Sequence, residues 1–326
     1  MLDKSVFIIV LIYVNNFLYL CTIIIGFMKQ YFKRRWFDRS DGWKITKIDP
    51  MMRLSPFFMR TRLDSQNLFE QTINIEKMEE FIKTHKEKIP NLSILHIITA
   101  TMVRVISQRP LLNRFIVWNK MYARNSVKIA LVFKQSLTDE GKEGIFIADF
   151  NPEDTLVDVS NKMDQLIQEN KVDNENNETD KLVKVINLLP DFVLRILVWL
   201  FYKLDSVGLL PASLLNASPF HSSAFITHVG TLGIPPVYHH LYEFGTTSMF
   251  LAIGKKEFEY SMDENEKMQK DRTIGLKFTL DERVCDGYYY AKSMREFSKY
   301  LHNPELLLTP PTEVIVDPGV GGKRIK

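Results

Sequence analysis

Residues 281–287 (DERVCDG) bring three carboxylates and a guanidinium together in one short stretch. Glutamate serves as a general base when burial or a negative neighbour raises its pKa from the reference value of about 4.3. Asp281 would raise the pKa of Glu282, whereas Arg283 would lower it. The residues alone therefore leave two roles open for Glu282: a general base, or a carboxylate that pairs with a basic residue.

Residues 224–233 (AFITHVGTLG) place a hydroxyl and an imidazole next to each other, just before a glycine turn. If this stretch is a strand, Thr227 and His228 point to opposite faces of the sheet. A histidine beside a glycine turn is more often structural than catalytic.

The remaining histidines and the cysteines do not predict a metal site. His221, His239 and His240 would need a third ligand and suitable geometry to hold a metal ion, so we expect none. Cys21 and Cys285 are too far apart in too different contexts to form a disulfide framework, which favours a reducing compartment.

The pattern around these stretches predicts a mixture of strands and helices. Alternating or apolar runs predict strands over residues 68–75, 113–117, 127–134, 144–150, 223–228, 247–254 and 273–281. Helical periodicity predicts helices over residues 76–86, 91–108, 152–169 and 288–301, with one or two more within the apolar stretch 183–210. Because strands and helices do not alternate regularly, the expected class is α+β rather than a doubly wound sheet.

The N-terminal segment predicts a membrane anchor. Residues 5–27 form an uncharged, mostly apolar run long enough to cross a bilayer, and a basic stretch containing Lys33, Arg34 and Arg35 follows it. This flank favours a cytoplasmic position for the rest of the chain. If translation starts instead at Met28, the expected protein is cytoplasmic and has no anchor.

Two motifs resemble the chloramphenicol acetyltransferase-like superfamily, in particular the 2-oxoacid dehydrogenase acyltransferase catalytic-domain family. Residues 281–287 resemble that family's Asp-His-Arg-Val-x-Asp-Gly motif, and residues 224–233 resemble its Phe-Thr-Ile-Ser-Asn-Leu-Gly segment. The similarity extends over about residues 48–308. It departs from the family at one position of the first motif, where Glu282 replaces the catalytic histidine.

The resemblance implies a two-layer α+β fold with a mixed sheet and flanking helices, and a homotrimer with active sites between subunits. It implies that Glu282 holds the position of the general base and that Thr227 donates a hydrogen bond to the oxyanion. Asp286 and Gly287, with Arg283, are expected to hold the motif's turn, and in the family this aspartate pairs with an arginine. His228 is the candidate substitute base, and Cys285 is expected to be buried and structural.

The resemblance further implies a CoA-dependent acyltransferase that moves an acyl group from acyl-CoA to a hydroxyl or thiol. Loss of the histidine leaves a second interpretation open, a trimeric pseudoenzyme that serves as a scaffold or ligand-binding module. The sequence shows no lipoyl domain, so we expect no lipoyl group on this chain.

The expected organisation is a hydrophobic segment at 1–28, a basic arm at 29–47, an acyltransferase-like domain at 48–310 and a C-terminal tail at 311–326. The net charge is only +3, and no long basic block is present, so the composition predicts no nucleic-acid partner.

Overall fold

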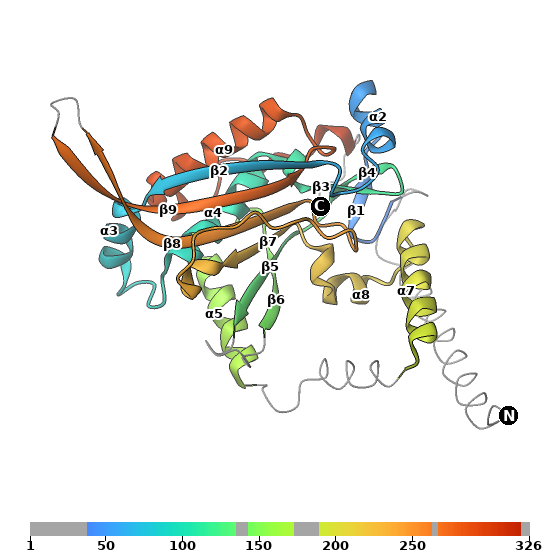
Figure 1. The fold of residues 1–326 in the computed structure, drawn as a ribbon, viewed down its shortest axis with the longest axis horizontal. Helices are drawn as coiled ribbons and strands as arrows, with labels where there is room; N and C mark the ends of the chain where they lie inside the picture. The colour runs from blue at the N-terminus through green and yellow to red at the C-terminus, as the bar shows by residue number, and fades with distance from the viewer. Residues whose placement is uncertain (1–37, 135–142, 173–188, 263–266, 321–326) are drawn as a thin grey trace.

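A six-stranded mixed sheet forms the centre of the protein (Figure 1). The computed structural model describes residues 38–134, 143–172, 189–262 and 267–320. The strands of the large sheet are β2 (Gln66–Asn74), β5 (Val127–Lys134), β6 (Glu143–Phe150), β7 (Ala224–His228), β8 (Met249–Met262) and β9 (Met268–Asp281). Their order is β2-β9-β8-β7-β5-β6. The β5–β7 and β7–β8 pairs are parallel and the others are antiparallel.

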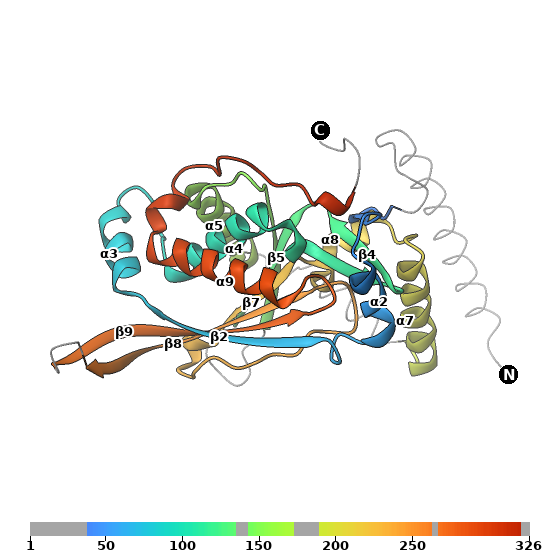
Figure 2. The ribbon, with the colours of Figure 1, turned by 90° about the horizontal axis from the view of Figure 1, so that it is seen from above.

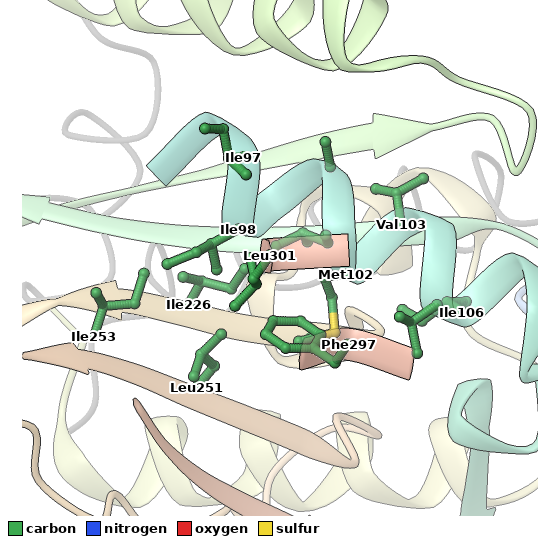
Figure 3. Packing of buried hydrophobic residues seen from close by; sticks show 14 of the residues in the cluster. Ile97, Ile98, Met102, Val103, Ile106, Ile226, Leu251, Ile253, Phe297 and Leu301 are labelled. Carbon is green, nitrogen blue, oxygen red and sulfur yellow. The ribbon is translucent and has the colours of Figure 1, made fainter. Parts of the chain in front are cut away.

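Four helices cover one face of this sheet (Figure 2). They are α3 (Glu76–His85), α4 (Ile94–Gln108), α5 (Leu156–Val172) and α9 (Gly287–His302). Nearly all of α4 is buried, and its side chains meet those of β7, β8 and α9 in the main core, as Ile98, Ile226, Leu251 and Phe297 illustrate (Figure 3). These two layers confirm the expected α+β class with a mixed sheet and flanking helices.

A second, three-stranded sheet lies at one end of the molecule. It contains β1 (Gly42–Lys44), β3 (Arg114–Val117) and β4 (Lys120–Arg124), in the order β1-β4-β3. The tight turn between β3 and β4 places Trp118 and Asn119 at positive φ. The short helix α2 (Pro50–Phe58) packs beside β4, and Asp49 caps its N-terminus by accepting hydrogen bonds from two backbone amides.

Residues on both sides of the expected domain boundaries pack into the same fold. Thr46 and Lys47 each donate a backbone hydrogen bond to the carbonyl of Gly319, and Arg114 forms a buried ion pair with Asp317 at 2.6 Å. The described parts of the expected arm and tail are therefore joined to the small sheet. The proposed boundaries remain predictions.

The apolar stretch 183–210 contains α7 (Asp191–Ser206), which is followed by α8 (Ala212–Ala217). Short 3-10 turns complete the chain at Pro110–Asn113, Pro219–His221, Val229–Leu232, Pro304–Leu307 and Pro318–Val320. No helix within the described ranges combines the length and apolarity needed to cross a membrane. The expected N-terminal anchor, residues 1–28, lies outside the described residues.

Candidate active-site motifs

The loop after β9 is held rigidly by the buried carboxylate of Asp281. Arg283 donates to both oxygens of Asp281, from Nε at 2.8 Å and from Nη2 at 2.7 Å. Ser65 Oγ donates to the same carboxylate at 3.0 Å, and the Tyr290 hydroxyl donates to the Asp281 carbonyl at 2.6 Å. Burial and charge pairing together make such a network strong and directional.

Glu282 projects from this rigid loop and is exposed to solvent. Its backbone N–H donates to the carbonyl of Ser65 at 2.8 Å. Its carboxylate makes no hydrogen bond and no ion pair with any residue in the described ranges. Arg283 pairs with Asp281, so it is not the basic partner of Glu282 within the described chain. The two roles that the sequence leaves open for Glu282 remain predictions.

Asp286 caps α9, and among the residues that the structure describes it does not form the arginine pair that the resemblance implies. Its side chain is exposed, and its Oδ1 accepts a hydrogen bond from the backbone N–H of Tyr289 at 2.8 Å. A carboxylate at this position also interacts favourably with the helix dipole. Gly287 begins the helix, and a methyl group added there would meet no atom within 4 Å. The arginine pair of this loop is formed instead by Arg283 and Asp281.

Cys285 is buried and structural, as expected. Its side chain belongs to the main core, and burial raises the pKa of its thiol to about 12. A protonated, inaccessible thiol is a poor nucleophile at neutral pH.

Thr227 lies near the carboxyl end of β7, with a hydroxyl that has no hydrogen-bond partner in the described chain. The residue is half-buried, and the hydroxyl makes no hydrogen bond within the part of the chain that the structure describes. Strand alternation places Thr227 on the face of Phe225, which packs with Ala130, Leu241 and Phe250 in a small cluster away from the main core. The hydroxyl can therefore donate to a group that approaches this face.

His228 follows on the opposite face, the face of Ile226 and the main core. Burial lowers the pKa of His228, and the positive charge of Lys256 lowers it further. The imidazole is therefore neutral at pH 7 and could accept a proton. Its position opposite to Thr227 argues against joint action of the two side chains on one reacting group.

The glycine turn after β7 is set by close backbone contacts. A Cβ atom at Gly230 would lie 2.1 Å from the carbonyl oxygen of Gly254, and one at Gly254 would lie 2.3 Å from Cδ of Pro236. The loop from Gly230 to Pro236 therefore lies directly against β8. Pro236 lies beyond the sequence motif at residues 224–233, so the motif does not reveal this contact.

Within one chain, Thr227 and Glu282 are far apart. Thr227 pairs with Ala252 of β8, and Ala252 pairs with Lys277 of β9. Glu282 lies five residues beyond Lys277, which corresponds to about 16 Å along the strand. A single chain does not bring the two side chains together.

Two of the histidines considered as metal ligands, His239 and His221, pack against aromatic rings. The ring of His239 stacks on Phe250 with centroids 4.0 Å apart, and the His221 ring lies near Phe201 and Phe244. Among the residues that the structure describes, no group of three or more His, Cys, Asp or Glu side chains is arranged to hold a metal ion.

Comparison with known proteins supports the fold and locates the family pattern. Residues 221–309 match the model of the 2-oxoacid dehydrogenases acyltransferase (catalytic domain) family, and this range contains both motifs. No curated protein matches the sequence.

Among solved structures, the cubic core of the pyruvate dehydrogenase multienzyme complex aligns with a TM-score of 0.51 and 12% identity, covering 80% of this chain and 93% of that one. A probable dihydrolipoamide acetyltransferase from Listeria monocytogenes aligns with a TM-score of 0.50 and 8% identity, covering 83% and 98%. A chloramphenicol acetyltransferase aligns at 0.43 with 12% identity, covering 79% and 99%. At these identities, the first two alignments establish a shared fold.

Proposed function

We propose that this chain, whose residues 221–309 match the model of the 2-oxoacid dehydrogenase acyltransferase catalytic domain, is a CoA-dependent acyltransferase. The acyl donor is acyl-CoA, and the acceptor is a hydroxyl or a thiol. The observation that carries the proposal is Glu282, an exposed carboxylate without a partner in the described chain. It stands at the base position of the family motif, on a loop that Asp281 and Arg283 hold rigid.

In the proposed reaction, Glu282 takes the proton of the acceptor, whose oxygen or sulfur attacks the thioester carbonyl. The hydroxyl of Thr227 donates a hydrogen bond to the oxyanion of the tetrahedral intermediate. When the carbon–sulfur bond breaks, the CoA thiolate leaves and takes up the proton from Glu282. The protein ends the cycle as it began, and every proton is accounted for.

The separation of Thr227 and Glu282 within one chain supports an active site shared between two subunits. We propose a homotrimer, in which Glu282 of one subunit faces Thr227 of the next. A thiol acceptor suits a carboxylate base better than a hydroxyl, because a thiol has a reference pKa of only about 8.5.

The second candidate function is a catalytically inactive trimeric scaffold or ligand-binding module. One observation favours it: within the described chain, no side chain orients the exposed carboxylate of Glu282 toward an acceptor. In addition, Arg283 neutralises Asp281, the nearest negative charge in the sequence.

The test uses the full-length protein with acetyl-CoA and longer acyl-CoAs. Binding is measured by calorimetry, and thioester turnover is measured as free CoA thiol. We expect Glu282→Gln to keep binding and to lose turnover by about 10²- to 10⁴-fold, the usual contribution of a general base. Glu259→Gln removes another exposed carboxylate and serves as the matched control with unchanged turnover.

Glu282→His separates the two candidate functions. If turnover appears only in this variant, the fold is an acyltransferase scaffold that has lost its base, and the scaffold function holds. If the native protein turns over and Glu282→Gln does not, Glu282 is a working base. If no acyl-CoA binds to any variant, both acyl transfer and CoA-dependent ligand binding are ruled out.

A further inference from the structure

Helix α7 exposes an unusually large apolar surface. Its exposed apolar residues lie around most of the helix, and Trp199 and Ile196 are 59% and 58% exposed. The full set is Phe192, Ile196, Leu197, Val198, Trp199, Leu200 and Tyr202. A helix that is apolar on nearly all sides is normally covered, either by protein or by lipid.

The exposed surface of α7 is held in a fixed position. Near the C-terminal end of the helix, Asp205 is buried and accepts a hydrogen bond from Nη2 of Arg39 at 2.6 Å. Phe201 packs against Phe244, with ring centroids 5.2 Å apart. These contacts anchor one side of the helix to the domain and leave the rest of its surface outside.

Helix α2 adds apolar surface at the same end of the molecule. Phe58 and Met51 are 72% and 71% exposed, and α2 lies at the same end of the molecule as α7 in both views (Figures 1 and 2). A chain of contacts joins the two regions. Arg62, which follows α2, donates to the carbonyl of Glu243, and the next residue, Phe244, packs edge-on against Tyr202 of α7.

The described chain begins at this same end of the molecule, where Arg39 contacts α7. Arg39, which binds Asp205, is separated by residues 28–38 from the uncharged apolar run at 5–27. Residues 28–38 include the basic side chains Lys33 and Arg34. The described chain therefore begins beside α7, and an apolar run and positive charges precede it in the sequence.

We infer that the apolar surfaces of α7 and α2 lie against a phospholipid bilayer that contains anionic lipids. Helix α7 lies in the plane of the interface, as amphipathic and apolar surface helices do. Trp199 and Tyr202 suit the headgroup level, and Lys203, whose Nζ lies 5.8 Å from the centroid of the Trp199 ring, can extend its ammonium group to the phosphates. Basic residues near the surface are attracted to anionic headgroups. This inference does not depend on the proposed acyl transfer.

The test places a fluorescent label on α7 in the full-length protein. In a Cys21→Ser background, where Cys285 is buried, Trp199→Cys is labelled with a nitrobenzoxadiazole dye. The protein is then reconstituted into vesicles of phosphatidylcholine and phosphatidylglycerol. Glu259→Cys is the matched control, because this exposed residue lies on the β8–β9 hairpin that projects from the opposite end of the molecule (Figure 1).

We expect the dye at position 199 to shift its emission to the blue and to be quenched several-fold by nitroxide-labelled lipids. The dye at position 259 should show neither effect. A water-exposed, unquenched dye at 199 on vesicles would overturn the inference. A dye at 199 that is shielded from water but not quenched by lipid nitroxides would overturn it too, because protein would then cover the surface.

A second variant tests whether the apolar character of α7 is needed. Ile196→Lys in the Trp199→Cys background should reduce quenching several-fold. Its thermal midpoint should stay unchanged, because Ile196 is exposed and contributes little to the core. Unchanged quenching in a folded Ile196→Lys protein would contradict the lipid contact.

Discussion

At position 227, the hydroxyl is what distinguishes threonine from valine, which has nearly the same shape. We predict that Thr227→Val lowers thioester turnover by about 10²- to 10³-fold, the loss seen when one oxyanion donor is removed. Acyl-CoA binding should change little, because the hydroxyl makes no other hydrogen bond in the described chain. Thr227→Ser should retain most of the turnover. Equal turnover in Thr227→Val and the native protein, measured as CoA release, would remove Thr227 from the mechanism.

Single residues of the motifs were predictable where a local rule decides their position. Strand alternation predicts that Thr227 and His228 lie on opposite faces, and the resemblance to the family motif implies that Cys285 is buried. The partner of Arg283 was not predictable in the same way. The carboxylate of Asp281 is fixed partly by Ser65, which is 216 residues away in sequence, and only the folded chain brings them together.

On the scale of elements, the anchor of α7 depends on Asp205. Burial alone would raise the pKa of Asp205, but the nearby His221 ring and the positive charge of Arg39 outweigh it and lower the pKa below its ordinary value. We predict that Asp205→Asn destabilises the protein by about 2 kcal/mol at neutral pH, because Arg39 loses one of its two charged partners and keeps only its pair with Asp41. Thermal unfolding measures this loss. Asp191→Asn, an exposed change in the same helix, is the control.

The sign of the pH dependence follows from the lowered pKa. The charged carboxylate stabilises the folded state above the ordinary pKa of aspartate, about 3.9, and this stability is lost as the pH falls through the lower, folded-state value. The difference between the native protein and Asp205→Asn should therefore shrink toward acid pH. A difference that stays constant down to about pH 2 would contradict this origin.

Elements with a buried face were predictable, and those without one were not. The buried stripe of α4 and the apolar alternation at the end of β9 indicate a helix and a strand close to those observed. The predicted strands 247–254 and 273–281 are extended to Met249–Met262 and Met268–Asp281. In the added parts, Phe258 and Tyr260 are exposed, so no burial pattern reveals a strand there. Helix α2, for which no burial pattern in the sequence predicts a helix, is likewise largely exposed.

On the scale of the molecule, the arrangement of the two motifs cannot be read from one chain. β7 carries Thr227 at its carboxyl end, whereas Glu282 follows the carboxyl end of β9, which points in the opposite direction because β8 is parallel to β7 and antiparallel to β9. Whether the two side chains meet depends on the symmetry of an assembly, and local sequence patterns do not encode that symmetry directly. In a closed ring with head-to-tail contacts, different surfaces of identical subunits meet, and this is the geometry that the two motifs require.

Subunit mixing tests that geometry. Glu282→Gln and Thr227→Val should each be inactive as pure trimers, since every interface lacks one of the two groups. The two variants are co-expressed in equal amounts, and only mixed trimers are kept by purification through a different tag on each. In every mixed trimer, an intact Glu282 then lies opposite an intact Thr227 at one of the three interfaces. Turnover should therefore return to about one third of the native rate. The double variant mixed with itself is the control and should stay inactive. Mixed assemblies without turnover, next to an active native protein, would mean that Glu282 and Thr227 do not form a shared site, and the mechanism would then have to rest on groups within a single chain.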